Sequence, residues 1–157
     1  MFPQNKTNYL GELLMSNWDK NLFIDHLREK CTREVAKVGV AIIEFTEKFA
    51  DDVSWGRGTD HGTLTFRCNT DVGPLPLFHM TSSGQLNLQI NFMRSKDIPP
   101  MVLRDVVLKL ESNFIRDYDE KEYPSDVFVP IDELFHTENQ LEKFLKTMEG
   151  ATYRLRQ

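Results

Sequence analysis

The strongest pattern in this chain is a run of apolar residues that recur at steps of three or four positions between residues 23 and 49. This spacing places them on one side of a helix; they are Phe23, Leu27, Cys31, Val35, Val38, Ile42, Phe45 and Phe49. It predicts one helix about 40 Å long. Because that exceeds the diameter of a small domain, we expect the helix to kink near Gly39 or to project toward a partner. Residues 38–43 are apolar on nearly every side, which predicts burial on more than one face.

A shorter amphipathic segment precedes this helix. Residues 9–18 carry apolar side chains at helical spacing, namely Leu10, Leu13, Leu14 and Trp18. The spacing predicts a helical arm within residues 1–20. The arm and the long helix together offer more apolar surface than one small domain covers, so we expect a symmetric homodimer formed through them.

After residue 62 the period of the pattern changes to two, which is typical of strands with one buried face. Two segments alternate clearly, with the apolar positions Leu64, Phe66, Cys68, Leu86, Leu88, Ile90 and Phe92 and the polar positions Thr63, Thr65, Arg67, Asn87, Gln89 and Asn91. Residues 74–80 predict a poorer strand, because Pro74 and Pro76 cannot donate to a ladder. Residues 127–131 predict a last strand. The polar positions predict either a sheet face open to water or a surface that binds a polar ligand.

Two further helices are predicted in the second half of the chain. One follows Pro99-Pro100 and carries apolar residues as far as Phe114. The other begins with Thr137 and Gln140 as a capping box and stops at Gly150. The sequence therefore predicts an α+β fold in which a small antiparallel sheet of about four strands packs against the long N-terminal helix and two later helices. With no repeat or linker, residues 1–157 are expected to form a single domain.

Charge and cysteine content narrow the classes of function. The net charge is −5, and residues 111–157 hold six basic against eleven acidic side chains. An acidic surface repels phosphate backbones, which argues against nonspecific duplex binding but leaves room for a local basic cleft. No apolar run is long enough for a bilayer and the start lacks a secretory signal, so we expect a cytoplasmic protein without membrane contact. Cys31 and Cys68 form no framework and are expected to be core residues with free thiols.

The densest group of reactive side chains is the glycine-rich segment at residues 55–62. We predict a ligand-binding site there and on the following strand, formed by Trp55, Arg57, Thr59, Asp60, His61 and Arg67. A functional interpretation makes the segment an anion site, with the Arg57 guanidinium and the loop amides as donors, or a hydrolytic site in which Asp60 orients His61. The alternative is a tight turn whose glycines only satisfy backbone angles and whose Trp55 plugs the core.

The histidines do not predict a metal site. No two of the four, His26, His61, His79 and His136, have the spacing that places imidazoles on one helical face. His26 and His136 are expected on the surface, and His79 on a strand with the parity of Leu75 and Leu77. The acidic run at residues 117–122 lacks the glycine and terminal glutamate of a calcium loop. We therefore expect no metal and no cofactor.

Several motifs are similar to those of a known type of domain. They are the segment Trp55-Gly56-x-Gly58-x-x-x-Gly62-Thr63, the alternating hairpin from Ser83-Gly84 to Ile90, and Pro130-Ile131 followed by residues 140–145. Together they resemble an uncharacterised bacterial domain associated with restriction and nuclease-type proteins. The resemblance covers residues 50–148 and implies an accessory role near nucleic-acid enzymes. It assigns no catalytic residue.

Three hypotheses of function follow. The leading one is a small binding or accessory module that recognises an anionic or polar ligand, a small molecule or a nucleic acid, through the glycine-rich loop. The second is a hydrolase in which His61 or His79 acts as general base and Arg57 stabilises negative charge. The third is a structural interaction protein whose polar sheet face is covered by a second chain. No complete catalytic signature is present, which favours a protein that is not an enzyme.

Overall fold

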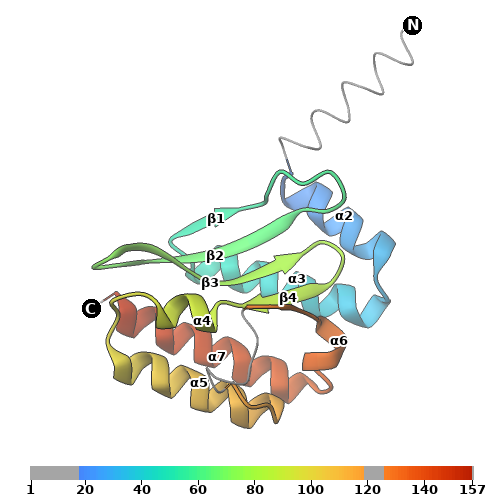
Figure 1. Cartoon of the computed structure of the whole chain (residues 1–157). Helices are drawn as coiled ribbons and strands as arrows, with labels where there is room; N and C mark the ends of the chain where they lie inside the picture. Colours follow the sequence, from blue (N-terminus) through green and yellow to red (C-terminus); the bar gives the residue numbers. More distant parts are fainter. Residues whose placement is uncertain (1–17, 119–125, 157) are drawn as a thin grey trace, which may run out of the picture.

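The computed structural model describes residues 18–118 and 126–156 and confirms the α+β class. Five antiparallel strands follow one another across the sheet in chain order, and helices cover one of its faces (Figure 1). The elements are α2 (Lys20–Lys30), α3 (Arg33–Phe49), β1 (Asp52–Ser54), β2 (Thr63–Thr70), β3 (Gly73–Thr81), β4 (Gln85–Leu88), α4 (Ile90–Arg94), α5 (Pro100–Phe114), β5 (Phe128–Pro130), α6 (Ile131–Leu134) and α7 (Glu138–Leu155). The predicted arm lies outside the described residues, except for its last few positions.

The prediction of one helix about 40 Å long is wrong, because this segment forms two helices, α2 and α3. The chain leaves helical geometry at Cys31, and the Thr32 side chain accepts a hydrogen bond from the Val35 amide to cap α3. Helix α3, with 17 residues, is about 26 Å long. Gly39 does not kink it. It is buried where α2 crosses α3, and a Cβ there would lie 2.5 Å from a Leu27 methyl carbon.

The strand pattern was only partly predicted. Strand β1 was missed, which is why the sheet has five strands instead of about four. The segment predicted as a strand through Phe92 ends at Leu88, and Ile90–Arg94 forms the short helix α4. A bulge opposite Phe66 and Arg67 shifts the register of β3, so Leu75 pairs with Cys68 and shares its core face. The parity that grouped His79 with Leu75 is therefore wrong.

The core is a chain of aromatic rings that joins the sheet to the helices. Phe45 of α3 stacks on Phe66 of β2, with 5.7 Å between the ring centroids. Phe66 contacts Phe78 of β3, and Phe78 meets Phe144 of α7 edge-on. Because such pairs add about 1 kcal/mol each to the gain from burial, they fix the sheet against α3 and α7.

The second half of the chain places α5 and α7 side by side below the sheet (Figure 1). Helix α5 begins at Pro100 as predicted, and the Thr137 hydroxyl caps α7 through the Gln140 amide. Gly150 does not stop α7, which continues to Leu155. In the part of the chain that the structure describes, no helix is both long and apolar enough to cross a membrane.

Candidate ligand-binding site

The glycine-rich loop, residues 55–62, connects β1 to β2. The sequence predicted a helix before it, but β1 comes between α3 and the loop, so the loop is the turn of a hairpin. The Thr63 amide donates to the Trp55 carbonyl, 2.9 Å away, and closes it. Gly56 adopts φ +84°, a left-handed conformation that favours glycine.

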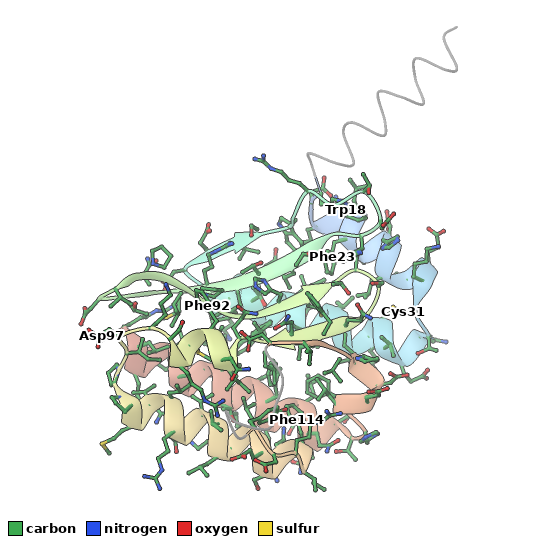
Figure 2. All side chains as sticks on the ribbon, viewed as in Figure 1. Trp18, Phe23, Cys31, Phe92, Asp97 and Phe114 are labelled. Atoms are coloured by element: carbon green, nitrogen blue, oxygen red, sulfur yellow. The ribbon has the colours of Figure 1, made fainter. Side chains whose placement is uncertain are left out.

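Trp18 holds the middle of the loop from the start of α2. Its indole Nε1 donates to the Gly58 carbonyl at 2.7 Å, and its ring is buried. Gly62 lies directly against it, since a Cβ there would be 2.8 Å from a carbon of the Trp18 ring. Figure 2 shows Trp18 and Phe23 together at this end of the molecule. Neither Gly58 nor Gly62 has a positive φ, so close packing explains them better than backbone freedom.

A buried serine fixes the far end of the loop, and sequence reasoning missed it. The Ser82 hydroxyl accepts from the Gly62 amide at 2.8 Å and lies 2.7 Å from His26 Nδ1. The Trp18 ring packs edge-on against the same imidazole. The prediction that His26 is a surface residue is therefore wrong. Because Ser82 has no solvent exposure, this serine and histidine form a support for the loop and do not present a nucleophile. His26 and Ser82 are 56 residues apart in the sequence, so no local sequence pattern could reveal their contact.

The tip of the loop is open to solvent. Arg57, Thr59 and Asp60 are exposed, and His61 is half-buried. The Trp55 ring is also half-buried and meets Phe23 edge-on at 5.5 Å. In the described part of the chain, the amides of residues 57–61 donate no hydrogen bond to protein, and none joins Asp60 to His61. The loop thus combines fixed ends with a run of uncommitted backbone donors.

Arg67 lies on the sheet and not on the loop. Its guanidinium donates to the Ser54 hydroxyl at 2.7 Å and approaches the Asp52 carboxylate at 3.8 Å. These contacts hold Arg67 against β1. The structure therefore brings together Trp55, Arg57 and His61 on one loop, whereas Arg67 belongs to the neighbouring sheet face.

His79 is the central titratable group of that face. Its Nδ1 lies 2.7 Å from the Thr65 hydroxyl, which sits opposite it on β2. Burial lowers the pKa of the imidazole below its usual value, and the Arg67 charge lowers it further, while Asp126 acts in the opposite direction. A neutral ring at neutral pH follows from this environment.

The pKa shift of His79 predicts a pH effect on stability. Since the folded pKa lies below the unfolded value of 6.5, the unfolded state binds more protons between the two values. The stability that neutral His79 contributes is complete above pH 6.5 and is lost as the pH falls toward the pKa of the folded state. We expect the parent to lose stability on acidification through this range more steeply than His79→Gln, measured by urea unfolding. An NMR titration that places the His79 pKa at or above 6.5 would contradict this assignment. In Arg67→Ala the His79 pKa is expected to rise, because a neighbouring positive charge is removed.

The rest of the polar face is closed by its own hydrogen bonds. The Gln89 amide donates to the Asn87 side-chain oxygen at 2.8 Å, and the Asn87 amide donates to the Asp126 carbonyl at 3.3 Å. The Asp126 carboxylate accepts from the Asn91 and Phe92 amides at the start of α4. Thr65, Asn87 and Gln89 are buried, so at these three positions the alternative of a sheet face open to water is wrong.

Neither cysteine is poised for reaction. Burial raises the pKa of the Cys68 thiol to about 11, and burial also raises that of Cys31. Both thiols stay protonated at neutral pH and act as small core groups. Among the described residues, no three His, Cys, Asp or Glu side chains gather closely enough to hold a metal ion.

Comparisons with protein-family models, with curated proteins and with solved structures found no match for this chain. The resemblance to a bacterial domain associated with restriction and nuclease-type proteins therefore stays a prediction. What the fold and the loop define is an α+β protein with a rigidly supported, donor-rich hairpin loop at one end of its sheet.

Proposed function

We propose that this protein is a binding module that holds an anionic ligand at the tip of the glycine-rich loop. The observation that carries the proposal is the run of amides at residues 57–61, which donate to no protein group in the described residues and lie beside the exposed Arg57. Successive backbone N–H groups together with a guanidinium are a common anion-binding arrangement. Trp55, Thr59, Asp60 and His61 would line the ligand and set its selectivity.

Rigid support of the loop favours binding over a simple turn. A turn needs only its own hydrogen bonds, whereas this loop is held by Trp18 at Gly58 and by Ser82 at Gly62. Fixing donors before the ligand arrives lowers the entropy cost of binding. By contrast, Arg67 is already held by Ser54 and Asp52 on the neighbouring sheet face, so the loop carries this proposal without it.

The test uses the two tryptophans as reporters. The chain has two, Trp18 and Trp55, and both contact or belong to the loop. Nucleoside phosphates and short oligonucleotides, titrated into the protein, are expected to change its tryptophan fluorescence. Arg57→Ala is expected to weaken binding about tenfold, because it removes a charge-assisted donor. The melting temperature should stay unchanged, since the Arg57 side chain is exposed.

The matched control is Lys30→Ala, which removes an exposed cation from the end of α2, away from the loop. It is expected to leave the fluorescence titration unaltered. If Arg57→Ala binds every compound as the parent does, with the same salt dependence, the anion site is refuted. The same holds if neither variant nor parent responds to any phosphate.

A hydrolase is the second candidate, and His79 is the observation that favours it. A neutral imidazole oriented by Thr65 beside a guanidinium has the properties of a general base. Its neighbouring cation is Arg67, not the Arg57 of the sequence hypothesis. If His79 is a base, phosphoester hydrolysis would rise with pH through its pKa and disappear in His79→Gln.

The remaining expectations concern location and partners. We retain a cytoplasmic location, a homodimer and a nucleic-acid-related role as parts of this proposal. The dimer was expected partly from the length of one continuous helix. That argument no longer holds, because the segment forms the two shorter helices α2 and α3. A groove between α2 and α3, lined by Arg28, Arg33 and Lys37 with Ala36 and Val40, is a local basic surface of the kind that the charge balance allowed.

A further inference from the structure

Helix α5 exposes an apolar ridge that the fold itself does not use. Met101 is 83% exposed, Leu108 55% and Ile115 89%, and each is seven residues from the next. A spacing of seven places Met101 and Leu108 on one side of α5, and Ile115 is the C-cap residue that follows the last turn of the helix. Single exposed apolar residues need no explanation, so this row suggests an interaction surface only together with the grooves and charges that surround it.

The backbone of Ile115 is also strained. As the C-cap of α5 it adopts φ 53°, a left-handed conformation that strains a β-branched side chain. Glycine is the usual residue at this position. An isoleucine that is both strained and exposed is unfavourable in the isolated chain, and contact of its side chain with another molecule would offset that cost.

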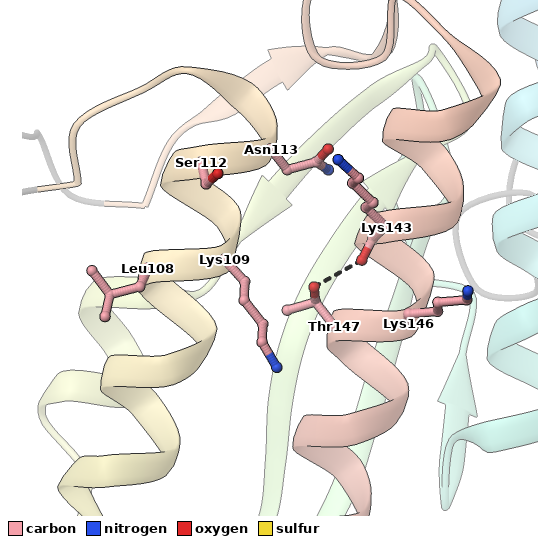
Figure 3. Close-up of a pocket in the computed structure, with 7 residues that line it drawn as sticks. All are labelled: Leu108, Lys109, Ser112, Asn113, Lys143, Lys146 and Thr147. Atoms are coloured by element: carbon pink, nitrogen blue, oxygen red, sulfur yellow. Dashed lines mark hydrogen bonds between the residues drawn. The ribbon is translucent and has the colours of Figure 1, made fainter.

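Two grooves run along the sides of the ridge and meet at Leu108. One, of about 400 Å³, lies between α5 and α7 and is lined by Leu108, Lys109, Ser112, Asn113, Lys143, Lys146 and Thr147 (Figure 3). The other, of about 310 Å³, is lined by Arg94, Pro100, Leu103, Arg104, Val107 and Leu108. Figure 3 shows Lys109 and Lys143 extending into the space between α5 and α7.

The charges of the two grooves have one sign. Arg94 and Arg104 line one groove, the three lysines line the other, and no acidic residue lines either of them in the described structure. The neighbouring acid, Asp105, is paired with Lys109 at 2.9 Å and with Arg154 at 2.8 Å, so Lys143 and Lys146 are the lysines of the first groove without an ion pair among the described residues. On a chain of net charge −5, a positive surface around an apolar ridge selects a negatively charged apolar partner.

We propose that the α5 ridge and its two grooves form a docking surface for an acidic amphipathic helix of another protein. Apolar side chains of that helix pack on both sides of Leu108, and its acidic flanks face the lysines of one groove and the arginines of the other. This surface lies on a different element from the glycine-rich loop and does not depend on an anion binding there.

The test uses a fluorescein-labelled synthetic helical peptide with leucines along one face and glutamates on both flanks, compared with the same peptide carrying lysines for the glutamates. Fluorescence anisotropy of the full chain is expected to show binding of the acidic peptide alone, weakened by added salt. Leu108→Asp is expected to reduce the affinity about tenfold or more, since it places a charge at the centre of the contact. The double variant Lys143→Glu with Lys146→Glu should reduce it as well.

The matched control is Val72→Asp, a comparable change at an apolar residue 47% exposed on the β2–β3 turn. It is expected to bind the peptide as the parent does, and the melting temperatures of all variants should match. Equal binding of both peptides, no binding of the acidic one, or insensitivity to Leu108→Asp overturns the proposal. A parent that is dimeric in light scattering and becomes monomeric in Leu108→Asp also overturns it, because a second copy then occupies the surface.

Discussion

Replacing Ile42 with aspartate is expected to destabilise the protein by about 4 kcal/mol. Ile42 lies in the middle of α3 with no solvent exposure, inside the core that the aromatic rings of α3, β2 and β3 share. A carboxylate there would be shielded from water and surrounded by the apolar side chains of this core. Because domains of this size are stable by about 5–15 kcal/mol, the variant should be partly unfolded at room temperature.

Urea unfolding followed by circular dichroism measures this loss. The control is Leu108→Asp, which makes the same chemical change at an exposed position of another helix and is expected to shift the midpoint little. A second control, Ile42→Val, should cost about 1 kcal/mol through the lost methylene alone. If Ile42→Asp unfolds at the same urea concentration as the parent, α3 does not pack as described.

Replacing Gly56 with alanine is expected to cost about 2–4 kcal/mol. Two effects add at this position. The φ of +84° is unfavourable for any residue with a Cβ, and the new Cβ would lie 2.8 Å from the Thr63 backbone nitrogen, which cannot move without opening the β1–β2 hairpin. Thermal unfolding is the measurement.

Gly73 supplies the matched control. It also has a positive φ, +103°, but a Cβ there meets nothing within 4 Å. Gly73→Ala is therefore expected to cost only the conformational part, about 1 kcal/mol. Equal losses in the two variants would show that the contact with Thr63 contributes nothing and that the loop is looser than its hydrogen bonds indicate.

The sequence predicted elements where periodicity is strong and local. The fold class, the strand from Thr63, the start of α5 at Pro100 and the Thr137 cap of α7 are confirmed. The capping box is only half formed, because the Gln140 side chain accepts from the His136 amide instead of the Thr137 amide. These features depend on residues within a few positions of one another, so a pattern can reveal them.

Errors arose where one side chain outweighed the pattern. The apolar spacing continues through Cys31, but the Thr32 cap ends one helix and begins another. In the same way, the alternation continues past Leu88, while the Asp126 carboxylate accepts hydrogen bonds from the Asn91 and Phe92 amides in the first turn of α4. A residue 35 positions away in sequence decides that local structure, and no window of neighbours contains it.

The candidate site was found from its composition, but its support was not. Glycines, an arginine and a histidine within one loop were visible in the sequence. The residues that fix the loop are Trp18 just before α2, His26 on α2 and Ser82 just after β3, and they carry no motif. Sequence reasoning assigned His26 to the surface because its helical neighbours are charged, and only the tertiary contact corrects that.

The short strands at both edges of the sheet have a consequence for how this chain avoids aggregation. Strands β1 and β5 have three residues each, and they flank the longer β2, β3 and β4. Beyond the end of β1, the Asp51 carboxylate accepts the Asn69 amide of β2, and Pro130 removes one donor from β5. An incoming strand therefore finds only short and interrupted rows of free backbone groups. Pairing of sheet edges into fibres is disfavoured while the fold is intact, and we expect copies of this chain that associate to do so through their helices or loops.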